Sequence, residues 1–124
     1  MAESGLFDIA AHLHLTKKFG FRPASDMGAE IAAALDAIAR GGMIVEVNTA
    51  GWYAPCGEVY PEPQIIRGCV AREIPLVVTA DAHSPAHLTR AFARAGRLLR
   101  DLGCSELASY AGRQRFMNML DAWE

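Results

Sequence analysis

The stretch that decides the fold is residues 43–49, MIVEVNT, together with the similar run LVVTA at residues 76–80. Both runs are short, rich in β-branched residues and preceded by glycine or proline, which is the pattern of a buried strand. Side chains alternate along a strand, so Glu46 and Asn48 share one face, opposite the valines. We therefore predict two strands, the first of which ends in polar side chains.

A third run of strand length comes earlier in the chain, at residues 6–13, LFDIAAHL, and helices are predicted between the strands. Apolar residues at i, i+3, i+4 and i+7 from Ile31 predict a helix that Ser25 caps and that ends at Gly41. Residues 61–73 open with two prolines, which suit a helix entry, and predict a second helix.

The C-terminal third of the chain predicts three further elements. Residues 84–102 predict a longer helix with Leu88 among its inward residues and its arginines on a solvated outer face. One more short strand is predicted at residues 105–110. The tail at residues 113–123 is predicted to form either a final helix or an edge segment.

Strands that alternate with helices predict an α/β fold of parallel βα units. In such folds, whether an open sheet or a barrel, ligand sites lie at the carboxyl ends of the strands. The three predicted strands end near His12, Asn48 and Asp81. The fold and the polar residues therefore indicate the same end of the sheet as the site of any chemistry.

Composition places the chain, residues 1–124, among single domains with one core. Lys and Arg number 12 and Asp and Glu number 14, giving a net charge of -2, which removes any electrostatic argument for binding nucleic acid or an anionic membrane. Three cysteines without metal-site spacing are typical of reduced thiols, so a cytoplasmic location is expected. No export signal and no membrane span is expected.

The polar residues at the predicted strand ends suit a divalent metal ion. Asp81 and His83 are two residues apart, offer a carboxylate oxygen and an imidazole nitrogen, and can point to the same side. His12, with His14 two residues further on, lies at the end of another strand, so His12, Asp81 and His83 are predicted to reach one ion. The alternative is that Asp81 caps the following helix while His12 and His83 satisfy each other or nearby backbone.

Other polar residues suit supporting roles. Glu46 and Asn48 are predicted to orient metal ligands or contact substrate, with a structural role as the alternative. Glu58, beside Tyr60, is predicted to be a buried acid that fixes its loop, with a catalytic role as the alternative. Lys17 is suited to bind a phosphate as a point charge, whereas the commoner role of such a lysine is a solvated loop position.

Three segments, FDIAAHLHLTKKFG, VEVNTAGWYAPCGEVYPEPQIIR and TADAHSP, resemble in order and spacing the C-terminal half of histidinol-phosphate phosphatases of the polymerase and histidinol phosphatase (PHP) family. The most specific parts are EVNTAG followed by GEVYP, and then DAHSP. The resemblance spans nearly the whole chain. It implies the C-terminal part of a distorted seven-stranded (β/α) barrel and a metal-dependent phosphatase of histidine biosynthesis.

The resemblance also implies roles for individual residues. His12, Asp81 and His83 correspond to metal ligands, with Asp81 and His83 as the catalytic pair, and the metal is zinc, manganese or iron. Lys17 falls where a basic residue often approaches the substrate phosphate, and the other substrate-binding positions correspond to Glu46 and Asn48. The substrate class is a small-molecule phosphate ester.

Several features of the family pattern are missing. The opening His-x-His and a further His and Glu have no counterpart, because the N-terminal half of the barrel is absent from this sequence. His14 stands where the family usually has aspartate, and residues 52–54 replace a stretch that commonly includes basic residues. We therefore keep two hypotheses: an incomplete, metal-dependent phosphoric monoester hydrolase, or a non-catalytic α/β module that forms a homo-oligomer or complements a separate N-terminal half.

Overall fold

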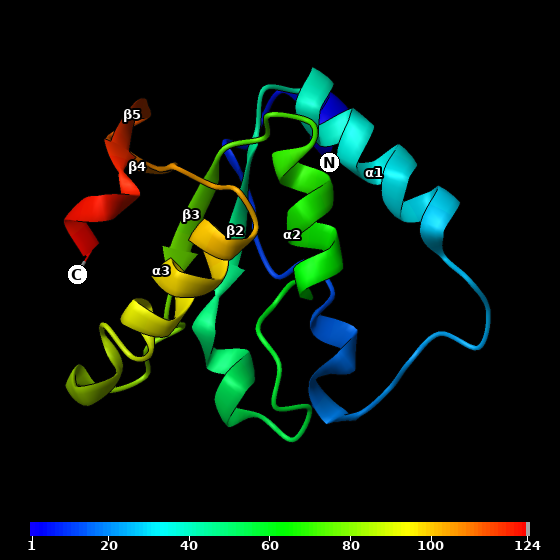
Figure 1. Ribbon diagram of the computed structural model, residues 1–124. Helices are drawn as coiled ribbons and strands as arrows, with labels where there is room; N and C mark the ends of the chain where they lie inside the picture. The colour runs from blue at the N-terminus through cyan, green and yellow to red at the C-terminus, as the bar shows by residue number, and fades with distance from the viewer. Residues whose placement is uncertain (124) are drawn as a thin grey trace.

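The computed structural model of the protein describes residues 1–123, and its centre is a parallel sheet of three strands (Figure 1). The strands are β1 (Ile9–Ala10), β2 (Ile44–Asn48) and β3 (Leu76–Thr79), and they lie in the order β1-β2-β3. Ile9 pairs with Ile44, and Val45 pairs with Leu76. The predicted α/β class with parallel strands is confirmed.

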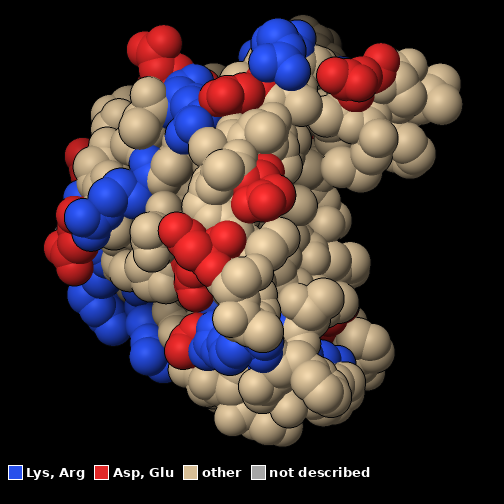
Figure 2. Space-filling model, turned by 90° about the vertical axis from the view of Figure 1, so that its right-hand side faces the viewer, with Lys and Arg blue, Asp and Glu red and all other residues tan. Residues whose placement is uncertain are grey.

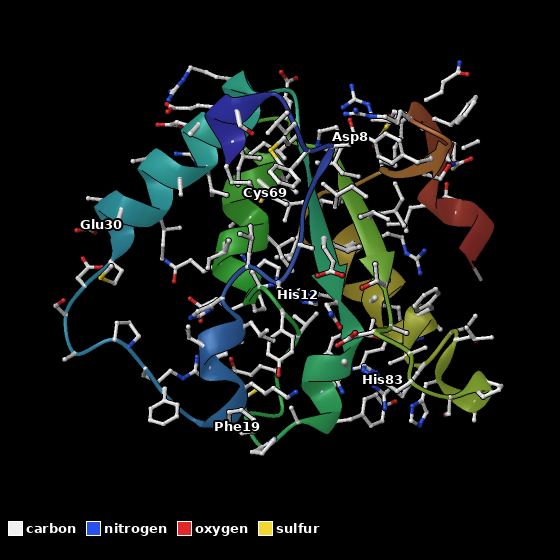
Figure 3. All side chains as sticks on the ribbon, turned by 180° about the vertical axis from the view of Figure 1, so that it is seen from behind. Asp8, His12, Phe19, Glu30, Cys69 and His83 are labelled. Atoms are coloured by element: carbon white, nitrogen blue, oxygen red, sulfur yellow. The ribbon has the colours of Figure 1, made fainter. Side chains whose placement is uncertain are left out.

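Three helices cover one face of this sheet, as the opposite views in Figures 1 and 3 show. They are α1 (Gly28–Arg40), α2 (Pro63–Val70) and α3 (Phe92–Asp101). Proline at the first position of α2 loses no hydrogen bond, because the first N–H groups of a helix have no partner within it. Because all three helices lie on the same side of neighbouring parallel strands, the sheet has one covered face and one without helices.

The core lies between the helices and the covered face of the sheet. Burial of apolar surface stabilises a fold by about 25 cal/mol per Å², so this layer provides most of the driving force. Its buried members include Ala10, Val45, Val47, Leu76 and Val78 from the strands and Leu35, Ile38, Ile65, Ile66, Cys69, Ala95 and Leu99 from the helices. The alternation of faces predicted for β2 is confirmed, because Val45 and Val47 pack in this core against the helices.

The strand predicted at residues 6–13 is much shorter in the structure. Only Ile9–Ala10 pairs with β2. His12 and His14 have φ angles of 58° and 64°, a left-handed conformation that cannot continue a strand. The predicted cap of the first helix is also wrong, because the N–H of Gly28 donates to Asp26 and not to Ser25.

The long helix predicted at residues 84–102 is interrupted. A 3-10 turn at Pro85–His87 comes first, and α3 begins only at Phe92. Ala91 has a φ of 60°, a left-handed conformation that interrupts a helix. The carbonyl of Arg90 accepts a hydrogen bond from the hydroxyl of Thr49, so at this position a tertiary contact takes the place of a hydrogen bond within a helix. Leu88, predicted to face inward, is 65% exposed.

The C-terminal third ends in an antiparallel hairpin of β4 (Glu106–Ala111) and β5 (Gln114–Met119). The strand predicted at residues 105–110 is confirmed, and the tail forms an edge strand followed by a 3-10 turn at Leu120–Trp123. Arg113 in the hairpin turn donates two hydrogen bonds, of 2.9 and 3.0 Å, to the carboxylate of Asp8. The hairpin is therefore attached near the amino end of β1.

The face of the sheet without helices carries exposed apolar side chains. Ile9 is 37% exposed and Phe7, just before β1, is 53% exposed. In Figure 2 this side forms the right-hand outline, which is hollowed and mostly free of charged residues, whereas Lys and Arg gather on the left. No helix in the described part of the chain is long and apolar enough to cross a membrane.

Candidate functional site

The segments that follow the three strands meet at the carboxyl end of the sheet. They are the 3-10 turn Leu15–Phe19 after β1, the turn Thr49–Tyr53 after β2, and the loop that contains Pro85–His87 after β3. Figure 1 shows all three at the lower end of the molecule, toward which β2 and β3 point. The polar residues of the predicted strand ends are thus at one end of the fold.

Glu46 joins the ends of all three strands. One carboxylate oxygen, Oε2, accepts the backbone N–H of His12 at 2.8 Å, and the other, Oε1, accepts the hydroxyl of Thr79 at 2.8 Å. The imidazole Nδ1 of His12 lies 3.6 Å from Oε2. Glu46 is buried, so these bonds, in which the acceptor is charged, hold His12 at a defined place beside β2.

Asn48 is completely buried at the end of β2. Its Oδ1 accepts the N–H of Ala50 and caps the following turn, while its backbone pairs with Tyr60. Its side-chain Nδ2 is buried without a hydrogen-bond partner among residues 1–123. Because an unpaired buried N–H group is costly, this amide is a donor available to a group that the described residues do not provide.

Asp81 and His83 lie in the loop after β3. Asp81 has a φ of 47°, and Nδ1 of His83 is 2.7 Å from the backbone carbonyl of Asp81. A carbonyl can only accept, so Nδ1 carries the proton and Nε2 is the nitrogen left to bind a ligand.

Figure 3 shows His12 and His83 well apart at this end of the sheet. Within residues 1–123 no group of three His, Cys, Asp or Glu side chains could hold a metal ion. The described residues therefore do not form a complete metal site on their own, and the assignment of His12, Asp81 and His83 as ligands stays a prediction.

Lys17 is completely buried and its ammonium is bound by a carboxylate. Nζ lies 2.9 Å from Oε2 of Glu58 and 5.8 Å from the centre of the Tyr60 ring. Arg22 donates to the other oxygen of Glu58 at 2.8 Å, and these two hydrogen bonds lower the pKa of Glu58. Glu58 thus holds the loop after β1 against the loop after β2, but its predicted burial is wrong, because its side chain is 42% exposed and the buried member of the pair is Lys17. The predicted phosphate contact of Lys17 stays untested.

His14 extends the same network of charges. Its Nδ1 is buried and lies 3.8 Å from Oε2 of Glu62, which is also 3.7 Å from Arg22. Burial lowers the pKa of His14, which favours the neutral imidazole. His14 lines a cavity of about 440 Å³ together with residues of α1 and α2, among them Ile31 and Ile65.

Two contacts between arginine and aromatic rings were not found from the sequence. The guanidinium of Arg90 lies 4.2 Å from the centre of the Tyr53 ring, and that of Arg94 lies 4.2 Å from the Trp52 ring. The pairs are about 40 residues apart in the chain, so no local spacing marks them, and the arginines were predicted on a solvated face. The sequence feature that could have indicated these contacts is the adjacent pair Trp52 and Tyr53 after β2, because two neighbouring aromatic rings in a loop must pack against other side chains.

These features define a class: an α/β unit of parallel strands with polar and charged side chains gathered at the carboxyl ends. No family model matches the chain. A probable histidinol-phosphatase of Deinococcus radiodurans is 43% identical to it over 102 residues, which are 82% of this chain and 38% of the relative. The chain is thus homologous to part of a probable histidinol-phosphatase, which confirms the predicted resemblance, and it spans about two fifths of that relative's length.

Proposed function

We propose that the chain is part of a metal-dependent phosphoric monoester hydrolase of the histidinol-phosphatase type. The observation that carries the proposal is the 43% identity to a probable histidinol-phosphatase over 82% of this chain. The three βα units, with their helices on one face and unpaired strands at both edges, support an arc of the distorted seven-stranded (β/α) barrel. The substrate we propose is a small phosphate ester.

We assign His12, Asp81 and His83 to an incomplete set of ligands for zinc, manganese or iron. The contacts of Glu46 support a positioning role, since it holds the backbone of His12 and the end of β3. The unpaired amide of Asn48 supports a contact with a group supplied from outside the described residues. The remaining ligands are proposed to come from the part of the relative that this chain does not match, so the chain alone is expected to be inactive.

The test mixes the purified chain with the unmatched part of the Deinococcus radiodurans relative, with zinc, manganese or iron added. We expect the mixture to retain metal and to release phosphate from histidinol phosphate, and each part alone to do neither. Asp81→Ala and His83→Ala are expected to lower the metal content, whereas His87→Ala, one turn further along, is not. A mixture that forms a folded complex but releases no phosphate would refute the proposed activity.

The second hypothesis, a non-catalytic module that binds another copy or a separate half, is favoured by the uncovered face of the sheet. Unpaired strand edges and exposed apolar residues such as Phe7 and Ile9 promote association. Light scattering is expected to show dimers or larger species, and Ile9→Lys is expected to shift them toward monomer. A well-folded chain that stays monomeric at every concentration would argue against this hypothesis.

We propose the cytoplasm as the compartment of this protein. Cys56, Cys69 and Cys104 are all free in the structure. Free thiols are typical of a reducing compartment.

A further inference from the structure

Two guanidinium groups are held against aromatic rings at the carboxyl end of the sheet. Arg90 stacks on Tyr53 and Arg94 stacks on Trp52, each at 4.2 Å from the ring centre. The completely buried Thr49 fixes the backbone beneath them, because its hydroxyl donates to the carbonyl of Arg90 at 2.7 Å. Stacking on a ring fixes the plane of each guanidinium, so little motion remains to be lost when an anion binds.

These two arginines have no carboxylate partner among residues 1–123. Five other cations form ion pairs in the structure: Lys17, Arg22, Arg40, Arg72 and Arg113. Arg90 and Arg94 differ from the remaining unpaired arginines of the described chain because each is stacked on an aromatic ring. The Nε of Arg90 is moreover buried without an acceptor. A guanidinium with a fixed plane and unused N–H groups is suited to bind carboxylate or phosphate through two parallel hydrogen bonds.

The location of Arg90 and Arg94 in the fold indicates which kind of anion they would bind. Trp52 and Tyr53 belong to the turn directly after β2, and Arg90 ends the loop that begins with Asp81 after β3. Each ring has one face occupied by an arginine, and the net charge of -2 gives no general attraction for nucleic acid. The local positive charge therefore suits a small anion at the same end of the fold as the predicted site.

We infer that Arg90 binds the phosphate group of a small phosphate monoester, and that Arg94 adds positive charge beside it. This inference rests on the proposed function for its choice of phosphate over other anions. Arg90 is a binding residue in this assignment. Tyr53 is a positioning residue, because it acts by holding the guanidinium plane.

The test uses inorganic phosphate as the probe and isothermal titration calorimetry on the full chain. Arg90→Gln is expected to weaken phosphate binding about tenfold, which corresponds to about 1.4 kcal/mol. Arg97→Gln is the matched control, because Arg97 is exposed on α3, the helix that follows Arg90, and its loss changes the net charge equally. Arg90→Lys is expected to recover only part of the affinity, since it keeps the charge without the planar fork.

Equal losses in Arg90→Gln and Arg97→Gln, or no loss in either, would overturn the inference. If Arg90→Gln does not fold, Tyr53→Ala replaces it, because it leaves the guanidinium in place and removes only its support. Tyr53→Ala is then expected to weaken phosphate binding, and unchanged binding would refute the site. The measurement needs neither metal nor turnover. Phosphate binding by the chain, together with a folded complex with the relative's unmatched part that releases no phosphate, would therefore refute the proposed function and leave this site standing.

Discussion

Glu58→Ala is expected to lower the free energy of unfolding by about 3 kcal/mol, whereas Lys17→Met is expected to change it by less than about 1 kcal/mol. The two residues form the same ion pair, but they are buried unequally. Lys17 is completely buried, while the side chain of Glu58 is 42% exposed. Removing Glu58 leaves a buried ammonium without a partner, and removing Lys17 leaves an exposed carboxylate that Arg22 still binds.

Urea unfolding of the two variants at neutral pH measures this asymmetry. The wild-type protein provides a second readout in acid. The hydrogen bonds of Lys17 and Arg22 lower the pKa of Glu58 in the folded state. A group of this kind stabilises the fold above its unfolded pKa, and that contribution is lost as the pH falls through the folded pKa.

The stability of Glu58→Ala should therefore fall less in acid than that of the wild-type protein. Equal effects of Glu58→Ala and Lys17→Met at neutral pH would show that burial of the lysine is not what makes the pair important.

Gly51→Ala is expected to lower the free energy of unfolding by about 3 kcal/mol, because a methyl group has no room there. A Cβ at this position would overlap the carbonyl oxygen of Glu58 and lie 3.0 Å from the ring of Tyr60. The overlapping atom belongs to the backbone, so a side-chain rotation cannot relieve the clash. The turn after β2 and the loop at residues 58–60 would have to separate.

Gly96→Ala is the matched control, with the same chemical change and the opposite expected sign. Gly96 lies inside α3, and the atoms nearest to an added Cβ are 3.9 and 4.0 Å away, an ordinary contact distance. Alanine is favoured over glycine in a helix interior by about 1 kcal/mol, so this variant is expected to be more stable. A Gly51→Ala variant as stable as the wild-type protein would contradict the close packing of the two loops.

The parts of the fold that follow local patterns were predictable. The alternation in MIVEVNT and the spacing of apolar residues in the helices led to the correct strands β2 and β3 and to the helices α1 and α2. These patterns work because burial of one face dictates the period of the sequence. The motifs EVNTAG, GEVYP and DAHSP led to the resemblance that the Deinococcus radiodurans relative confirms.

Elements that depend on distant contacts were predicted less well. The helix at residues 84–102 has a continuous apolar stripe, yet Thr49, about 40 residues away, binds the carbonyl of Arg90 and helix α3 begins only after it. In the same way, left-handed conformations at His12 and His14 end the first strand early. A periodic pattern carries no information about such contacts, so the boundaries were wrong.

The same distinction between local patterns and distant contacts applies to the candidate site. The sequence alone determined which residues stand at the ends of the strands, because the carboxyl ends of parallel strands share one edge of the sheet. Only the tertiary structure decided their partners: Glu46 with His12 and Thr79, Lys17 with Glu58, and Arg90 with Tyr53. The physical reason is that hydrogen bonds and charge contacts extend only a few ångströms, so they depend on where loops from distant parts of the chain come to rest.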